Sequence, residues 1–134
     1  MSTEQNKQTV REFFEHFSTA NVSAALDLLD DAVIWRAMGN EGGLPMSGEM
    51  DKKAVGGLIV NVKEAIPKGL KLTPTGWTAE EDRVALEMES YGDMSNGKVY
   101  QNHYHFLVTL SNNKITVLRE YMDTYHAKQV FIDD

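Results

Sequence analysis

One stretch of the sequence, residues 98–124, carries polar side chains where a strand should be apolar. Glu120 follows Leu118 and precedes Met122 at the two-residue period of a β-strand, so the three side chains share one predicted face. An unpaired charge is costly to bury, so a carboxylate on an apolar face either has a partner or lines a cavity. Burial also raises the pKa of a carboxyl group, which would make Glu120 a usable general base.

The strand predicted just before it places two more polar groups on the same side. Asn102 and Tyr104 share one face of that strand, and the short turn at 112–113 makes the two strands neighbours because Asn tolerates left-handed backbone. We therefore predict a catalytic group of Glu120, Asn102 and Tyr104, in which the amide and the phenol donate hydrogen bonds to a developing oxyanion. Asp123, at the rim, is the second-choice acid.

Two alternatives to this site remain open. A shift of one residue in strand register would place Arg119, Tyr121 and Asp123 inside and Glu120 in solvent. We favour the first arrangement because it puts the apolar side chains of the partner strand in the core. With Glu120 inside, the carboxylate could still serve only a structural hydrogen-bond network, paired with Asn102, Tyr104 or a buried water.

Two features could bind a metal ion or a cofactor, and neither has a complete pattern. His103 and His105 lie two apart on one strand face, and Glu87 and Glu89 could lie opposite them on the next strand, but no third zinc ligand has a fixed spacing. The glycine-rich segment 39–48 lacks the Lys-Ser/Thr pair of a phosphate-binding loop, so we expect a flexible mouth over the core. We predict neither a metal site nor a cofactor.

Three helices are predicted before the large sheet. The first begins at Ser2 and carries an apolar stripe of Val10, Phe13, Phe14 and Phe17. Asn21 caps a short second helix that ends at Asp30-Asp31. Asp51 caps the third, whose apolar positions are Val55, Leu58, Ile59, Val62 and Ile66.

The strands follow mostly as a late meander. Strands are predicted at 32–38, 70–78 and 83–91, before the hairpin 98–124, and a tail or short closing helix at 124–134. Pro74 and Gly76 make the second an edge strand or a bulged one. This order predicts an α+β fold: a cone-shaped roll of N-terminal helices packed on a strongly curved antiparallel sheet, in one domain over 1–134.

The predicted pocket lies between the helices and the concave face of the sheet. Its wall should be apolar and aromatic, which suits an apolar small-molecule ligand. The expected wall residues are Trp35, Phe14, Phe17, Leu58, Val62, Met88, Ser90, Phe106, Leu118 and Met122.

Composition limits the partners and the compartment. A net charge of −7 disfavours a nucleic acid or an anionic membrane surface as the main partner, because both need a basic face. The chain has no cysteine and no apolar run of about 20 residues, so we expect no disulfide, no spanning helix and a cytoplasmic location. Leu107, Val117 and Tyr121 would leave the outer sheet face apolar, which predicts a homodimer through that face.

Four segments carry a resemblance to a known family: Val10-Arg-Glu-Phe-Phe14, Leu26-Asp-Leu-Leu-Asp-Asp-Ala-Val-Ile-Trp35, Asn96-Gly-Lys-Val-Tyr-Gln-Asn-His-Tyr-His-Phe106 and Lys114-Ile-Thr-Val-Leu-Arg-Glu-Tyr-Met-Asp123. Their order and spacing resemble the SnoaL-like and ketosteroid-isomerase-like branch of the nuclear transport factor 2 superfamily. The resemblance implies a cone with one internal pocket, usually dimeric through the outer sheet face. Of the acidic residues that epoxide-hydrolase relatives use, only the position on the last strand is matched, by Glu120.

The family implies diverse functions, including isomerases, aldol cyclases, epoxide hydrolases, dehydratases and non-catalytic binders. We predict a small-molecule enzyme that performs cofactor-independent acid–base chemistry, namely isomerisation, cyclisation or hydration/hydrolysis, on an apolar organic substrate in the internal pocket. The alternative is a non-catalytic ligand-binding or protein-interaction domain of the same fold. The full residue set of ketosteroid isomerase itself has no match in the sequence.

Overall fold

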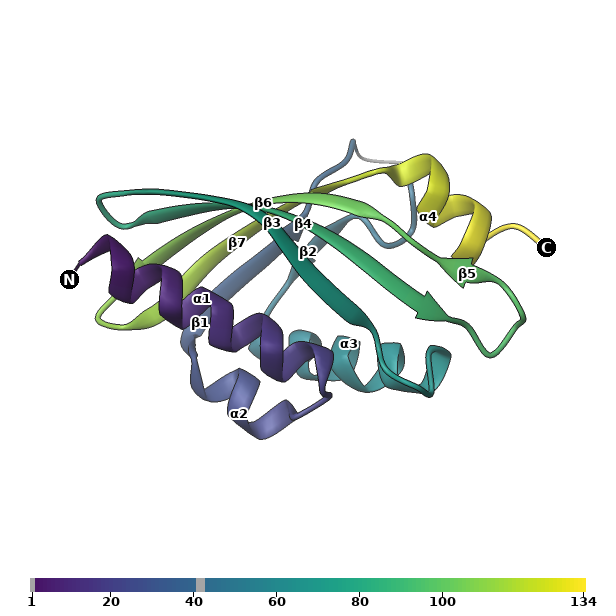
Figure 1. Cartoon of the computed structure of the whole chain (residues 1–134), viewed down its shortest axis with the longest axis horizontal. Helices are drawn as coiled ribbons and strands as arrows, with labels where there is room; N and C mark the ends of the chain where they lie inside the picture. The colour runs from purple at the N-terminus through teal and green to yellow at the C-terminus, as the bar shows by residue number, and fades with distance from the viewer. Residues whose placement is uncertain (1, 41–42) are drawn as a thin grey trace.

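A computed structural model of the chain describes residues 2–40 and 43–134. Figure 1 shows a curved sheet with α1, α2 and α3 below it and α4 beside β5 at one end. The helices are α1 (Thr3–Ser18), α2 (Val22–Asp27), α3 (Lys52–Ala65) and α4 (Thr124–Phe131). The strands are β1 (Leu29–Ala37), β2 (Gly48–Met50), β3 (Lys71–Glu80), β4 (Arg83–Asp93), β5 (Val99–Tyr100), β6 (His103–Ser111) and β7 (Lys114–Met122).

The three predicted helices begin where their capping residues indicated. The side chains of Ser2, Asn21 and Asp51 each accept a hydrogen bond from a backbone N–H in the first turn of the helix that follows. The predicted end of α2 was wrong. The helix stops at Asp27 and β1 begins at Leu29, because this chain segment pairs with β7 and makes strand hydrogen bonds instead of helical ones.

The sheet is mixed and mostly antiparallel, with the strand order β2-β1-β7-β6-β4-β3 and β5 paired to β4. Sequence reasoning predicted only antiparallel pairs, but β1 and β7 run parallel. The parallel pair arises because α3 carries the chain away from β1 before the meander starts. The last strand of the meander, β7, then lies beside β1 and runs in the same direction.

Local strand features follow the predicted turn chemistry. β3 is an edge strand whose register shifts between Pro74 and Gly76, as the sequence indicated. Asn112 and Asn113 adopt left-handed backbone, with φ of 50° and 65°, and join β6 to β7. Segment 39–48 was predicted as a loop, but Gly48 already pairs with β1 as the start of β2. Residues 41 and 42 of that segment lie outside the described residues.

The core lies between the concave face of the sheet and helices α1 and α3. Phe13 and Phe17 of α1 pack on Trp35 of β1, with ring centroids 6.1 and 5.8 Å apart. Trp35 in turn meets Phe106 of β6 edge to face at 5.7 Å. These aromatic pairs fix α1 across the sheet and bury Trp35.

The C-terminal segment forms a closing helix, α4. Phe131 packs edge to face on Tyr100 of β5, with ring centroids 4.8 Å apart, and Val130 is buried. The amide of Asn96 donates a hydrogen bond to the carbonyl of Val130, and Lys98 Nζ donates to that of Gln129. These contacts hold α4 at one end of the cone. Among the described residues, no helix has the length and apolar character needed to span a bilayer.

Candidate active site

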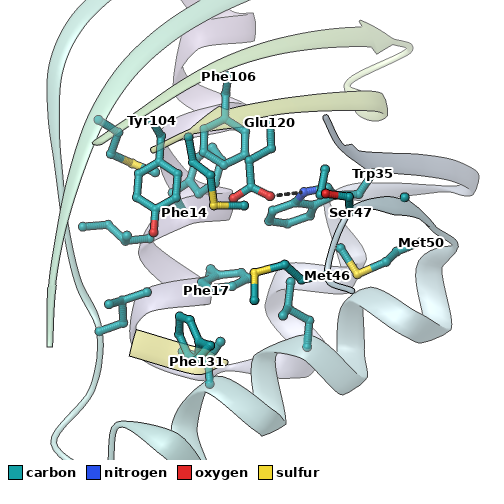
Figure 2. A pocket seen from close by; sticks show the side chains of 18 of the residues that line it. Phe14, Phe17, Trp35, Met46, Ser47, Met50, Tyr104, Phe106, Glu120 and Phe131 are labelled. Atoms are coloured by element: carbon teal, nitrogen blue, oxygen red, sulfur yellow. Dashed lines mark hydrogen bonds between the residues drawn. The ribbon is translucent and has the colours of Figure 1, made fainter. Parts of the chain in front are cut away.

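A cavity of about 420 Å³ lies between the concave sheet face and helices α1 and α3 (Figure 2). Residues 45–50 and α4 also contribute to its wall. Seven aromatic side chains line it: Phe14, Phe17, Trp35, Tyr100, Tyr104, Phe106 and Phe131. Four methionines complete much of the remaining wall: Met46, Met50, Met88 and Met122.

Glu120 of β7 contributes a carboxylate to the sheet wall of this cavity. In the β6–β7 register, Glu120 pairs with Phe106 and the next inward pair joins Leu118 to Val108. The predicted parity is therefore correct, and the one-residue register alternative is wrong because Arg119 and Tyr121 are exposed on the opposite face. In β1, Trp35 and Ala37 face the cavity beside Glu120.

Trp35 supplies a hydrogen-bond partner for this half-buried carboxylate. Its indole Nε1–H donates a hydrogen bond to Glu120 Oε1 at 3.1 Å, drawn as a dashed line in Figure 2. Burial raises the pKa of Glu120 to about 7, and the hydrogen bond from Trp35 opposes this rise. The carboxyl group is therefore divided between its acid and its base form near neutral pH, which is the condition for general acid–base chemistry.

Three hydroxyl groups gather on the wall formed by β4, β5 and β6. Tyr100 and Tyr104 both line the cavity, and their hydroxyls share a short hydrogen bond. Ser90 lies behind them, with its Oγ 3.1 Å from the Tyr104 hydroxyl. Burial raises the pKa of both tyrosines, so they remain neutral hydrogen-bond donors at neutral pH.

Asn102 does not reach the cavity, contrary to the prediction. It is 0% exposed, and its side-chain amide donates to the Tyr100 hydroxyl at 3.1 Å and to the Asp123 carbonyl at 3.2 Å. The reason is a break in the predicted strand. β5 ends at Tyr100 and β6 begins at His103, and Asn102 between them keeps its inward parity but is enclosed by its hydrogen bonds to Tyr100 and to the Asp123 carbonyl.

Asp123 is not an acid at the cavity rim, contrary to the second-choice assignment. It is exposed, and its carboxylate accepts a hydrogen bond from the His126 N–H at 3.2 Å as the N-cap of α4. β7 ends one residue earlier, at Met122, and the chain turns into the helix. Asp123 therefore fixes the position of α4 rather than facing a ligand.

Most of the predicted wall is present, with two exceptions. Phe14, Phe17, Trp35, Leu58, Val62, Met88, Phe106 and Met122 line the cavity together with Tyr104 and Glu120. Ser90 and Leu118 do not: Ser90 is turned toward Tyr104 and the Asn102 N–H, and Leu118 is fully enclosed in the core beside Val108.

Several parts of the wall were missed, among them Ala37, Leu70 and Leu72. Tyr100 lies four residues before Tyr104 and shares its inward face, so the two-residue period of the strand was the signal that could have identified it. Phe131 belongs to segment 124–134, which was predicted only as a tail or short closing helix, with no indication of where it would lie. Residues 45–50 gave no signal, because their position depends on the pairing of β2 with β1.

The histidine pair lies on the outer face of the sheet. His103 and His105 pair with Glu89 and Glu87 of β4, and His103 Nδ1 is 3.4 Å from Glu89 Oε1. Within 2–40 and 43–134, no group of three or more His, Asp or Glu side chains is arranged to hold a metal ion.

Comparison with known proteins gives a consistent fold. Residues 10–118 match the SnoaL-like domain family, and no functionally curated protein matches the chain. An NTF2-like protein from Burkholderia xenovorans LB400 is 22% identical with a TM-score of 0.79, covering 97% of this chain and 98% of that one. A protein from Jannaschia sp. CCS1, assigned as a SnoaL-like polyketide cyclase, is 15% identical with a TM-score of 0.78, covering 96% and 92%.

An LEH-like epoxide hydrolase from M. tuberculosis is 14% identical, with a TM-score of 0.78 and coverage of 97% of this chain and 91% of that one. At these identities the likeness establishes the fold. The chemistry has to be argued from the cavity.

Proposed function

Because the chain belongs to the SnoaL-like domain family, we propose that it catalyses cofactor-independent acid–base chemistry on an apolar organic substrate. The fold is shared with proteins described as a polyketide cyclase and an epoxide hydrolase, and both descriptions name small organic substrates. The observation that carries the proposal is Glu120: a carboxylate with a pKa near 7, enclosed by aromatic side chains.

Glu120 is the proposed general base. Its carboxylate takes a proton from a substrate carbon, and the electron pair of the broken C–H bond moves into a neighbouring carbonyl group to form an enolate. Where the enolate is conjugated with a C=C bond, return of the proton from Glu120 to the far carbon completes an isomerisation. Where the enolate carbon attacks a second carbonyl group of the substrate, the resulting alkoxide takes the proton back from Glu120, which completes a cyclisation. Neither route needs an oxidant, a reductant or another reactant.

Trp35 and the aromatic wall prepare the base for this role. A carboxylate in water is stabilised by hydration, whereas the cavity offers Glu120 one indole N–H and apolar surface. The anion is therefore more basic than an exposed glutamate, which raises its reactivity toward a weakly acidic C–H group. Trp35 also fixes the carboxylate, because one oxygen is held while the other is free to meet a ligand.

The cavity favours a neutral, flat substrate. Its volume of about 420 Å³ lies within the usual range for small-molecule sites, roughly 300–1,000 Å³. Aromatic rings provide flat apolar contact, and the flexible methionines allow the wall to adapt to ligands of different outline. Glu120 and Glu49, which both line the cavity, disfavour an anionic substrate.

A Kemp elimination tests the base without knowledge of the natural substrate. The probe, 5-nitrobenzisoxazole, is flat and neutral; a base removes its C–H proton, the N–O bond breaks, and a coloured cyanophenolate forms. We expect the wild-type protein to accelerate this reaction, with a rate that rises with pH through about 7 as Glu120 ionises. Glu120→Gln should reduce the rate by about 100-fold or more.

Glu49→Gln is the matched control, because Glu49 also lines the cavity but is exposed and lies 3.9 Å from Arg36. Its rate should stay within about twofold of the wild type, since an exposed carboxylate does not serve as the base. Equal rates in wild type and Glu120→Gln would contradict the proposal. If the wild type binds the probe without converting it, the alternative of a non-catalytic ligand-binding domain is correct.

A further inference from the structure

A groove of about 320 Å³ lies between α1 and the edge of the sheet formed by β3 and β4, separate from the internal cavity. α1 packs on both of these strands (Figure 1). Phe14, Leu72 and Met88 line the groove and the cavity alike, so they form a partition between the two spaces. The volume is at the lower end of the usual range for small-molecule sites, roughly 300–1,000 Å³, so the groove suits a small compound.

The irregularity in β3 determines which side chains face the groove. Pro74 pairs with Met88 and Trp77 pairs with Leu86, because the register shifts between Pro74 and Gly76. Cross-strand partners point to the same face of a sheet, so Trp77 shares the inner face with the buried Leu86. Strict alternation from Pro74 would instead place Gly76 on this face and Trp77 on the outer one. The bulge therefore supplies the groove with an indole ring.

Arg11 of α1 is held over this indole ring. Its guanidinium carbon lies 4.8 Å from the centroid of the Trp77 ring, and its Nη1 donates a hydrogen bond to Gln8 Oε1 at 2.9 Å. In the part of the chain that the structure describes, this is the one hydrogen bond that its five N–H donors make to another residue. The guanidinium is therefore fixed at the groove wall with donors left for an anionic group.

Glu15 brings the opposite charge to the same groove. It follows Arg11 by four residues, so the two side chains lie on one face of α1. They form no ion pair with each other, and within 2–40 and 43–134 neither is paired with another charged side chain. A cation before an anion is the less favourable order for such a pair, and the indole ring competes for the guanidinium. The groove therefore presents a cation and an anion one helical turn apart.

The rest of the groove is apolar or already hydrogen-bonded. Phe14, Leu86 and Met88 are buried core residues that line it. The hydroxyls of Ser18 and Thr19 donate to backbone carbonyls, so they add no charge. A ligand with only a positive charge would be repelled by Arg11, and one with only a negative charge by Glu15. A ligand that carries both charges beside an apolar group complements all of these features.

We propose that this groove is a second ligand site, which takes a small zwitterion with a flat apolar side group, such as an aromatic α-amino acid. The ligand carboxylate accepts hydrogen bonds from Arg11, its ammonium group donates to Glu15, and its side group packs on the apolar residues and Trp77. The proposal goes beyond the proposed function, because none of these contacts involves Glu120. The groove site and the general base can therefore fail independently.

The two tryptophans of the chain allow a test that reports each space separately. Trp77 lines the groove and Trp35 lines the cavity. In an NMR titration of the nitrogen-15-labelled full-length protein with L-phenylalanine, the indole N–H signal of Trp77 should move and saturate, with a dissociation constant of about 1 mM or below. The Trp35 signal should stay in place, because Trp35 is buried beyond the partition and bonded to Glu120. Trp77→Phe assigns the two signals.

Two further probes keep the phenyl ring and remove one charge each. 3-Phenylpropionate lacks the ammonium group, and phenethylamine lacks the carboxylate. Each should bind at least about 3-fold more weakly than L-phenylalanine, because one ionic contact is lost and one repulsive charge of the groove is left unmatched.

The two charges of α1 can be removed one at a time. Glu15→Gln should weaken L-phenylalanine binding about 3- to 5-fold and should not weaken 3-phenylpropionate. Arg11→Gln should weaken L-phenylalanine about 5- to 10-fold and should not weaken phenethylamine. Glu4→Gln is the matched control, because it removes an exposed carboxylate of the same helix that does not line the groove. Its affinity should stay within about twofold of the wild type. An unchanged Trp35 signal shows that each variant is folded.

Three results would overturn the proposal. The Trp77 signal would not move up to millimolar L-phenylalanine, the three probes would bind equally well, or the Trp35 signal alone would move because the ligand enters the cavity. A loss in Glu4→Gln as large as that in Glu15→Gln would also contradict it, since binding would then depend on overall charge. None of these results affects the role of Glu120, which the Kemp elimination tests by itself.

Discussion

Two carboxylates of the same sheet each meet a nitrogen donor, on opposite faces. On the inner face, Glu120 accepts a hydrogen bond from Trp35 Nε1 at 3.1 Å; on the outer face, Glu89 lies 3.4 Å from His103 Nδ1. The side chains of His103 and Glu89 are 70% and 53% exposed, so water screens their interaction. Glu120 instead faces an aromatic cavity, and burial raises its pKa to about 7.

The difference between the faces is set by strand parity alone. Arg119 and Tyr121 flank Glu120 in β7 and both point to the outer face. Each therefore lies one residue from the proposed base yet contributes nothing to the cavity wall. The same side-chain type becomes a candidate base or a solvated surface group according to the face on which it lies.

The largest expected difference between the faces concerns stability. Leu118→Ala should lower the free energy of unfolding by about 2–5 kcal/mol, because Leu118 is fully buried and truncation leaves a void. Arg119→Ala, one residue later and exposed, should change it by no more than about 0.5 kcal/mol. Urea denaturation of both variants measures the two values. Equal losses would mean that the inner face is not the packed one.

Much of this inner face could be predicted because two-residue alternation is a strong constraint. Phe106 and Leu118 could occupy the core together only if Glu120 also faced inward, so the parity and the candidate base followed from the sequence. The starts of the capped helices and the Asn112-Asn113 turn could also be predicted, because they depend on the local sequence. Each depends on residues within about one turn of chain, where side-chain and backbone chemistry decide the conformation.

The errors occur where strands end and distant segments meet. Asn102 lies in a break between β5 and β6, and Asp123 caps α4 instead of extending β7. Alternation cannot indicate where a strand stops, because the preceding residues keep the same pattern. The wall formed by residues 45–50 depends on pairing of β2 with β1, a tertiary contact without a local signature.

The next largest effect is a pH dependence of stability that arises from the inner carboxylate, Glu120. Between pH 4.5 and about 7, the unfolded chain releases the Glu120 proton while the folded chain retains it. Stability therefore falls as pH rises through this window, by at most about 3 kcal/mol once pH exceeds 7. Glu120→Gln stays neutral and should lack this loss, so it should exceed the wild type in stability at pH 8 and match it near pH 4.

Thermal melts of wild type and Glu120→Gln across pH 4–8 measure this difference. Glu89→Gln is the matched control, because it removes an exposed carboxylate from the outer face of the same sheet. Its stability difference from the wild type should stay within about 0.5 kcal/mol over the whole range. Parallel curves for wild type and Glu120→Gln would show that Glu120 is not held in its raised-pKa environment.

A smaller effect should come from apolar groups on the outer face. Tyr121 and Ile34 are each 42% exposed there, near the half-buried Leu107 and Val117, and we expect this surface to form a homodimer. Leu107→Asp should raise the dimer dissociation constant about tenfold or more, because it would bury a charge in the contact. Val99→Asp, on β5, is the control and should leave the constant unchanged. Analytical ultracentrifugation tests this; a wild-type monomer at micromolar concentration would contradict the expectation.

The smallest expected effect is the coupling across the outer pair itself. A double-mutant cycle of His103→Gln and Glu89→Gln should give at most about 0.5–1 kcal/mol at pH 6, falling with added salt, because both side chains are largely exposed. The cycle of Trp35→Phe and Glu120→Gln should give about 1.5–3 kcal/mol at pH 8, where Glu120 is ionised and its hydrogen bond is partly shielded from water. Trp35→Phe should also move the pKa of Glu120 higher still, since the lost indole N–H stabilised the anion. Carbon-13 NMR titration of the glutamate carboxyls measures that change in the pKa. If the coupling energy of His103 and Glu89 were as large as that of Trp35 and Glu120, burial would not distinguish the two carboxylates.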